Sequence, residues 1–244
     1  MKQQILTVTE NHRIAENVYQ MALENPELEE QKPGQFVNIR LQGKFLRRPI
    51  SVYASEKGRL TIIYKVVGQG TEQMSRIGER EQLDVLTGLG NGYDLSKAGN
   101  RPLLLGGGVG VPPLYQLARK LRAEGRDVTA VLGFNRKEEV FGEEAFKALG
   151  CKVTVTTADG SYGVKGFVTD ALPEEYSYFY TCGPEPMLRA VYRATKTSGQ
   201  FSFEERMGCG FGACMGCSCK TITGYKRICR EGPVLEKEEI LWED

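Results

Sequence analysis

The chain has 244 residues, of which 41% are hydrophobic and 26% charged, as in an ordinary globular protein of one or two domains. Its formal net charge of +1 gives no electrostatic reason to expect nucleic acid or an anionic membrane as a partner. The chain has a single histidine, His12, which nearly excludes chemistry that needs a histidine base, a Ser–His pair or a histidine-rich metal site. Electron or hydride chemistry would therefore have to come from cofactors.

The chain shows no apolar run near the roughly 20 residues that a membrane-spanning helix needs. Its first residues also lack the sustained apolar stretch of a secretory signal. We therefore expect a cytoplasmic protein with no membrane partner.

Residues 1–97 alternate short strand patterns with turns, which predicts a small antiparallel β-barrel. A Pro-Gly pair precedes alternating apolar residues in the segment 32–41. Residues 48–67 indicate a hairpin that turns at Glu56, Lys57 and Gly58, and a further strand leads into the Gly-rich turn before residue 97. The fold class we predict is therefore this barrel followed by an α/β domain and a small C-terminal loop domain.

Residues 98–200 change pattern, because short apolar strands now alternate with helical segments. Strands are expected within 101–108, 127–134, 151–157 and 176–183, and helices within 111–125, 143–150 and 184–199. Such alternation predicts a parallel sheet with crossover helices. Residues 201–244 are too rich in Gly and Cys for either element and indicate a loop wrapped around a ligand.

Two short motifs of the predicted barrel point to a phosphate-bearing, heteroaromatic cofactor. Arg48 offers a permanent planar cation for a phosphate, and the Ser51 hydroxyl can hydrogen-bond a ring heteroatom. Gly70 permits close approach to a helix N-terminus at which Thr71 is expected as the N-cap. Either motif alone is equally compatible with an ordinary strand or turn, but their order on one barrel favours a binding site.

The predicted parallel sheet carries two motifs at strand ends. The first is Gly106–Pro113, where glycines let a dinucleotide phosphate approach the backbone; it departs from the Rossmann pattern by its two prolines. The second is Thr181–Met187, expected beside the first at the carboxyl edge of the sheet. Cys182 either faces a nicotinamide or flavin or is a small buried residue. A tight strand-to-helix turn without a ligand is the alternative for both motifs.

Four cysteines near the C-terminus have the spacing of a plant-type 2Fe-2S cluster, C-x4-C-x2-C and then a distant fourth residue. The four are Cys209, Cys214, Cys217 and Cys229. Neighbouring glycines at 208, 210, 212 and 216 permit the positive φ angles of a tight loop. A structural zinc site or redox disulfides are the alternatives, and Cys219 is a further thiol that could enter the ligand set.

The order of these motifs, together with the tail segments ERMGCGFGACMGC and CREGP, resembles the ferredoxin–NADP reductase superfamily. Within it, the tail is similar to the electron-transfer subunits of class 1B dihydroorotate dehydrogenases. The resemblance covers essentially the whole chain, and implies an FAD-binding barrel (1–97), an NAD-binding α/β domain (98–200) and a 2Fe-2S domain (201–244).

The resemblance also implies roles for individual residues. FAD would be held by Arg48, Pro49, Ile50, Ser51, Ile63, Tyr64, Lys65, Gly70 and Thr71. NAD would be held by Gly107, Gly108, Gly110, Gly183 and Pro184. Ser51 and Cys182 are the catalytic candidates, and the four cysteines would ligate the cluster. Ile50 departs from the superfamily, in which many members carry a flavin-stacking Tyr there, and Cys219 is not required by the pattern.

The implied function is an electron relay. A separate FMN-containing subunit would oxidise dihydroorotate in pyrimidine biosynthesis, and electrons would pass through the 2Fe-2S cluster and FAD to NAD⁺. The implied assembly is a heterotetramer with two copies of each subunit. Alternatives are a NAD(P)H–ferredoxin or hydrogenase-associated flavin subunit, and a zinc-stabilised binding module without redox function.

The choice of NAD over NADP rests on the resemblance alone. The predicted second strand of the sheet ends at Gly133–Arg136, where no acidic residue stands to bind a ribose hydroxyl. Arg136 at that place could even suit a phosphate.

Overall fold

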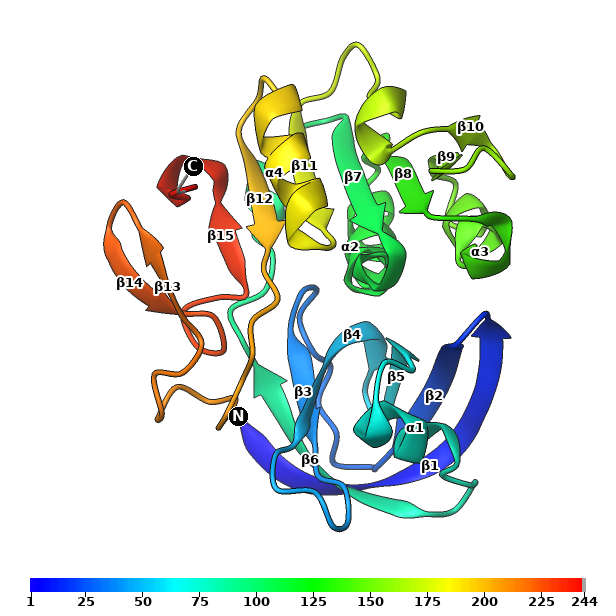
Figure 1. Ribbon diagram of the computed structural model, residues 1–244, viewed down its shortest axis with the longest axis vertical. Coiled ribbons are helices and arrows are strands. Elements are labelled where there is room, and N and C mark those ends of the chain that lie inside the picture. Colours follow the sequence, from blue (N-terminus) through cyan, green and yellow to red (C-terminus); the bar gives the residue numbers. More distant parts are fainter. Residues whose placement is uncertain (243–244) are drawn as a thin grey trace.

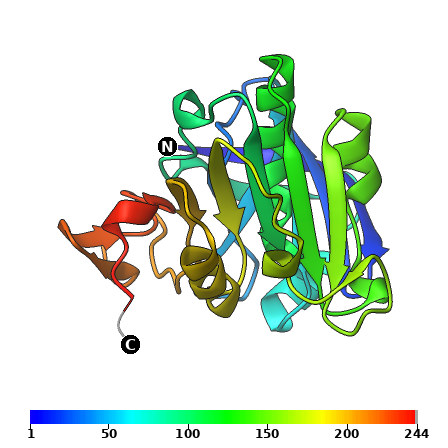
Figure 2. The same cartoon turned by 90° about the horizontal axis from the view of Figure 1, so that it is seen from above.

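The computed structural model describes residues 1–242 and consists of a closed barrel, a seven-stranded sheet and a small C-terminal unit (Figure 1). The predicted fold class is confirmed. Seen from above, the C-terminal unit projects to one side of the sheet (Figure 2). Among the described residues, no helix is long and apolar enough to cross a membrane.

The barrel is built of six antiparallel strands in the order β1-β2-β5-β4-β3-β6. Their bounds are β1 Lys2–Ala15, β2 Val18–Glu24, β3 Phe36–Ile39, β4 Arg48–Glu56, β5 Arg59–Lys65 and β6 Gln82–Leu89. The short helix α1, Gln69–Ser75, lies between β5 and β6 in sequence and buries Met74 in the barrel core. The expected hairpin turn is present, with Gly58 at φ +86°.

The sheet has the order β10-β9-β8-β7-β11-β12-β15, and adjacent strands are parallel except β12 with β15. The strands are β7 Pro102–Gly107, β8 Thr129–Phe134, β9 Lys152–Thr157, β10 Val164–Lys165, β11 Tyr178–Cys182, β12 Gly199–Ser202 and β15 Val234–Glu236. The helices are α2 Pro112–Ala123, α3 Glu143–Ala148 and α4 Glu185–Ala194. Short 3₁₀ turns are η1 Leu95–Lys97, η2 Gly108–Gly110, η3 Lys137–Glu139, η4 Val168–Ala171 and η5 Lys237–Glu239.

The two faces of the sheet are covered by different helices. Leu114 of α2 and Phe146 of α3 belong to one buried cluster, which the barrel residues Val18 and Ile63 also join. Leu188 and Val191 of α4 pack in a second cluster on the other face. The barrel therefore shares a hydrophobic core with the α2 face of the sheet, and the apolar area buried there holds the two together.

The last helix is shorter than the sequence predicts. Residues 184–199 were expected to be helical, but α4 ends at Ala194, and Thr195 has the extended backbone angles φ −86° and ψ 138°. The reason is tertiary, because Gly199 has to begin β12, which pairs with Phe179 of β11. The strand spans the predicted boundary at 200, and β15 brings the C-terminal segment into the same sheet.

The C-terminal unit contains a two-stranded sheet of β13 Ser218–Thr221 and β14 Gly224–Arg227. Its contacts with the rest of the chain include a strand pairing and a close glycine–proline contact. β15 pairs with β12, and Pro233 packs so closely on Gly90 that a Cβ at residue 90 would lie 2.6 Å from the proline ring.

Gly199→Ala should destabilise the sheet edge that carries β12. An added Cβ would lie 2.3 Å from Cε1 of Phe179, whose ring is fully buried and cannot move aside. We expect the free energy of unfolding to fall by about 1–3 kcal/mol, the usual cost of overpacking a core. Thermal and urea melts followed by circular dichroism would measure it. Gly78→Ala is the control, because its Cβ would meet only Glu81 Oε1 at 3.4 Å; equal losses in both variants would contradict the packing argument.

Candidate functional site

Arg48 of β4 and the N-terminal end of α1 come together, as the sequence predicts. A Cβ on Gly70 would lie 2.1 Å from Arg48 Nε, so the guanidinium rests directly on this glycine. A hollow of about 420 Å³ opens there. Its lining residues are Lys44, Arg48, Val67, Gly68, Gln69, Gly70 and Thr71. Two cations beside a glycine backbone form a cradle that fits a diphosphate.

The expectation that Thr71 is the N-cap is wrong, because α1 begins one turn earlier. The N-cap is Gly68, and Thr71 is the third helical residue. The Thr71 hydroxyl nevertheless accepts hydrogen bonds from the backbone N–H groups of Val67 (2.9 Å) and Gly68 (3.3 Å). It thus stabilises the same loop from inside the helix.

The side chains of the predicted flavin motif lie alternately on the two sides of strand β4. Val52 lies in the barrel core and Ile50 packs against that core. Because side chains alternate along a strand, Ser51 lies on the outer side with Tyr53. Tyr53 stacks on Tyr115 of α2 with ring centroids 4.3 Å apart, so this outer side faces the sheet domain.

The neighbouring strand β5 is divided in the same way. Tyr64 is buried in the barrel and its hydroxyl donates to Asn11 Oδ1 at 2.9 Å. Ile63 points the other way, into the core shared with the sheet. Lys65 forms an ion pair with Glu139 of η3 at 3.1 Å. The side chains of all three residues are therefore occupied by structural contacts, and their backbone pairs with β2 on one edge of the strand.

The two glycine motifs of the sheet lie side by side at its carboxyl edge, as expected. The strands β7 and β11 pair in parallel with Gly106 opposite Cys182. A Cβ on Gly110 would lie 2.2 Å from the Cys182 carbonyl oxygen, and one on Gly107 would lie 2.3 Å from Met187 Sδ. The order of the sheet reverses at β7, between β8 and β11, which is where open α/β sheets bind ligands.

The remaining members of that motif border the same edge. Gly108 has φ +52° with open space around a would-be Cβ, and Gly183 backs onto the Gly107 amide. Pro184 is the N-cap of α4. Burial raises the pKa of the partly exposed Cys182 thiol to about 12, so it stays a neutral thiol at physiological pH.

An acidic residue that the sequence pattern did not show reaches the end of β8. Glu139 folds back from η3 and its Oε2 accepts hydrogen bonds from the backbone N–H (3.2 Å) and side chain (2.9 Å) of Asn135. Arg136 is held by Glu16 of the barrel through a 2.5 Å ion pair. Glu139 reaches the strand end from four residues after Asn135, whereas Glu16 is brought there by the tertiary fold.

The four predicted ligand cysteines form two pairs. Cys209 interacts with Cys214, and Cys229 interacts with Cys217. Cys214 is exposed, whereas Cys217 and Cys229 are buried. Two thiol pairs are the donor set that two irons require, one pair for each iron. Within residues 1–242, no group of three or more His, Cys, Asp or Glu side chains converges on a single metal position.

Backbone N–H groups point at the sulfur atoms of these pairs. Ala213 N–H donates to Cys209 Sγ (3.2 Å) and Cys229 N–H donates to Cys217 Sγ (3.4 Å). Burial alone would raise the pKa of Cys209, but the N–H groups around it and the Cys214 side chain lower that pKa to about 6. Cys209 is thus favoured as a thiolate, whereas burial and the neighbouring Cys217 side chain raise the pKa of Cys229 to about 12.

Two details of the cysteine loop differ from expectation. Of the four glycines, Gly210 and Gly212 have positive φ (+79° and +94°), and Met215 adopts φ +61° although it is not a glycine. The extra thiol, Cys219, lies on β13 opposite Lys226, where burial raises its pKa.

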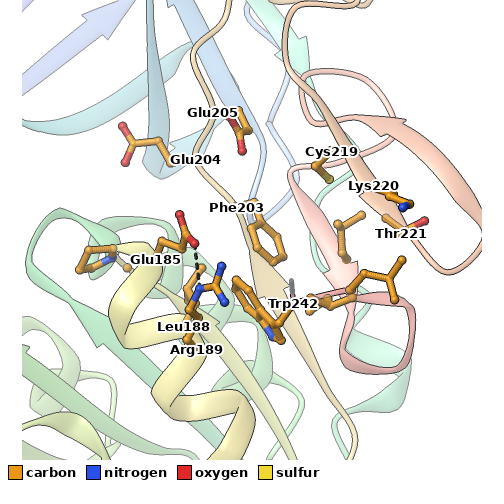
Figure 3. Close-up of a pocket in the computed structure, with 15 residues that line it drawn as sticks. Glu185, Leu188, Arg189, Phe203, Glu204, Glu205, Cys219, Lys220, Thr221 and Trp242 are labelled. Atoms are coloured by element: carbon orange, nitrogen blue, oxygen red, sulfur yellow. Dashed lines mark hydrogen bonds and ion pairs between the residues drawn. The ribbon is translucent and has the colours of Figure 1, made fainter. Parts of the chain in front are cut away.

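A second hollow, of about 440 Å³, separates α4 from the C-terminal unit (Figure 3). The ion pair of Glu185 with Arg189 (2.9 Å) lines one wall, and Cys219 lies on the opposite wall. Trp242 lines it too, with the Arg189 guanidinium 4.7 Å from its ring centroid. The hollow begins at Gly183 and Pro184, next to the predicted nucleotide edge.

Comparison with known proteins agrees with this arrangement. Residues 204–241 match the iron–sulfur cluster binding domain of dihydroorotate dehydrogenase B, and residues 104–193 match the oxidoreductase NAD-binding domain. A solved structure of an NADH-dependent reduced ferredoxin–NADP oxidoreductase superposes with a TM-score of 0.88 at 32% identity, covering 97% of this chain and 90% of that one.

Curated relatives match over nearly their whole length. The electron transfer subunit of dihydroorotate dehydrogenase B (NAD⁺) from Bacillus pumilus is 44% identical, covering 98% of both chains. The subunit of the same name from Fusobacterium nucleatum is 43% identical, covering 96% of both. At this identity and coverage, the chain belongs to the family of electron transfer subunits of NAD-dependent dihydroorotate dehydrogenase B.

Proposed function

We propose that this chain accepts electrons from a dihydroorotate-oxidising partner and delivers them to NAD⁺. One observation carries the proposal. The four cysteines form two pairs on a chain that also has a glycine-rich sheet edge for a nucleotide and a cationic hollow for a diphosphate. When bound, a 2Fe-2S cluster supplies one-electron transfer and FAD supplies the exchange between single electrons and a hydride. The sum is dihydroorotate + NAD⁺ → orotate + NADH + H⁺.

For FAD, we assign the diphosphate to Arg48, Gly70 and Thr71, because their cradle combines a planar cation with close backbone approach. The outer side of β4, with Pro49 and Ser51, would position the flavin ring, and Ile50, whose side chain packs on the barrel core, would contribute its backbone. The backbone of β5 at Ile63, Tyr64 and Lys65 would complete the site, since the side chains of these residues are already engaged.

For NAD, we assign Gly107, Gly108 and Gly110 to the diphosphate, because side chains are absent where the backbone meets the ligand. Gly183 and Pro184 border the same edge. The Ser51 hydroxyl and the neutral Cys182 thiol are the candidates that orient the reacting rings, as hydrogen-bonding groups and not as acid or base.

Membership of the family implies a separate catalytic subunit. We propose that this subunit contains FMN, that two copies of each chain form a heterotetramer, and that the assembly works in the cytoplasm, where thiols remain reduced. A second candidate function follows from the 32% identity to the ferredoxin–NADP oxidoreductase structure: the same parts would then exchange electrons with a ferredoxin.

Metal analysis of anaerobically purified protein, co-expressed with the neighbouring catalytic subunit, tests the relay. We expect one flavin with about two irons and two sulfides per chain. Cys214→Ser should lose the cluster, whereas the control Cys219→Ser should keep it, because Cys219 belongs to neither thiol pair. Flavin with stoichiometric zinc and no sulfide would refute the proposal. Reduction of the cluster by dihydroorotate only in the presence of the partner would separate the first function from the ferredoxin alternative.

Gly70→Ala should weaken FAD binding by about tenfold or more. The added methyl would displace the Arg48 guanidinium from the position in which it would bind the FAD diphosphate. Fluorescence titration of the flavin-free protein would measure the dissociation constant. Gly78→Ala is the control, since Gly78 does not line this hollow and an added Cβ would meet only Glu81 Oε1 at 3.4 Å. Similar affinities for the two variants would contradict the role of the Arg48–Gly70 contact.

We attribute the preference for NAD to the carboxylates at the end of β8. Glu139 would oppose a 2′-phosphate, and Glu16 neutralises the one arginine at that strand end, Arg136. Glu16→Ala should therefore raise the kcat/KM for NADPH relative to NADH by roughly threefold to tenfold in a diaphorase assay. Glu10→Ala, which removes a similar ion pair of β1 with Arg59, should leave the ratio unchanged. No change in either variant would place nucleotide selection elsewhere.

A further inference from the structure

Asn38 is a polar residue buried in the wall of the barrel where an apolar side chain would be expected. It lies on β3 and is 1% exposed. Its neighbours Val37 and Ile39 point into the barrel core, whereas Phe36 packs in the core formed with the C-terminal unit. By strand alternation Asn38 also lies on that outer side, so the cysteine-bearing segment is what buries it.

Asn38 touches the cysteine loop directly. Its Nδ2 donates a hydrogen bond to the backbone carbonyl oxygen of Cys209, the first residue of the ligand set, at 3.3 Å. The following residue, Gly210, rests on the same amide, since a Cβ there would lie 2.2 Å from Nδ2. These two contacts set the distance between β3 and the cysteine loop at Cys209, the first predicted ligand.

The other side of Asn38 belongs to the predicted flavin motif. In the register of β3 and β4, Asn38 is opposite Pro49, between Arg48 and Ser51. Its Oδ1 is buried and has no hydrogen-bond partner among the described residues. A buried amide oxygen without a donor is costly, so such an atom indicates a partner supplied by something else.

We propose that Asn38 is a positioning residue of the electron path, which sets the distance between the iron–sulfur loop and the flavin by bonding the loop with its amide N–H. Its free oxygen is available to a flavin donor, the ring N–H or a ribityl hydroxyl. Electron tunnelling falls steeply with distance, so a loop that shifts on the barrel slows transfer even when both cofactors remain bound. The proposal rests on the proposed function.

Two variants of Asn38 test its amide N–H donor and its amide oxygen. Asn38→Asp keeps the shape but replaces the N–H donor with an oxygen that repels the Cys209 carbonyl. Asn38→Leu removes donor and acceptor together. The matched control is Asn91→Leu: Asn91 also contacts the C-terminal segment, through the Glu231 and Val234 carbonyl oxygens, which follow the last ligand and lie outside the loop 207–216.

Single-turnover reduction of the full complex by NADH is the first measurement. The hydride carries two electrons to the flavin, one of which passes to the cluster and converts one Fe(III) to Fe(II). In both Asn38 variants we expect unchanged flavin bleaching but cluster reduction slower by about tenfold or more, as for other misplaced reacting groups. Asn91→Leu should show the wild-type rate.

Hydrogen exchange of the cofactor-free chain is the second measurement and does not need a loaded cluster. Amides 207–216 should exchange faster in both Asn38 variants than in the wild type and in Asn91→Leu, because the loop has lost its contact with the barrel. Wild-type exchange together with wild-type transfer rates in both Asn38 variants would overturn the proposal. A wild-type chain that holds neither flavin nor iron would instead refute the proposed function, and exchange would still report on Asn38.

Discussion

The hydrophobic core shared by the barrel wall and one face of the sheet sets how the predicted flavin strand and the nucleotide edge lie relative to each other. Ile63 of the barrel joins Leu104 and Leu114 of the sheet domain in that core, and the Tyr53–Tyr115 stack extends it. As a result, the outer side of β4 faces α2, and η2 with its glycines lies close to β5. The predicted flavin strand and the nucleotide edge therefore lie close together.

The C-terminal unit depends on the same frame for its position. β15 extends the sheet beyond β12, Pro233 packs against Gly90 at the end of the barrel strand β6, and Asn38 contacts the cysteine loop. A segment of few regular elements is therefore attached to both larger parts. This arrangement suits a relay, because its cofactors need fixed separations while its side chains perform little chemistry of their own.

The side chains of the site shape the binding surfaces and orient the ligands, and do not themselves react. Cys182 is held as a neutral thiol by burial, and Tyr64 is committed to the barrel core. The N–H groups around Cys209 do the reverse and favour a thiolate, as a metal ligand must be. Burial at Cys182 and hydrogen bonds at Cys209 thus favour opposite protonation states in two cysteines of one chain.

The sequence by itself determined the fold class, the cysteine set and the two glycine motifs, because turn glycines, strand periodicity and ligand spacing are local signals. It could not predict that α4 stops at Ala194 or that Thr71 is not the N-cap, since β12 pairing and the loop before α1 decide these ends. Only the tertiary structure brought Glu16 to Arg136 after β8 and Asn38 beneath Cys209. Such contacts join residues far apart in the chain, and no local pattern encodes them.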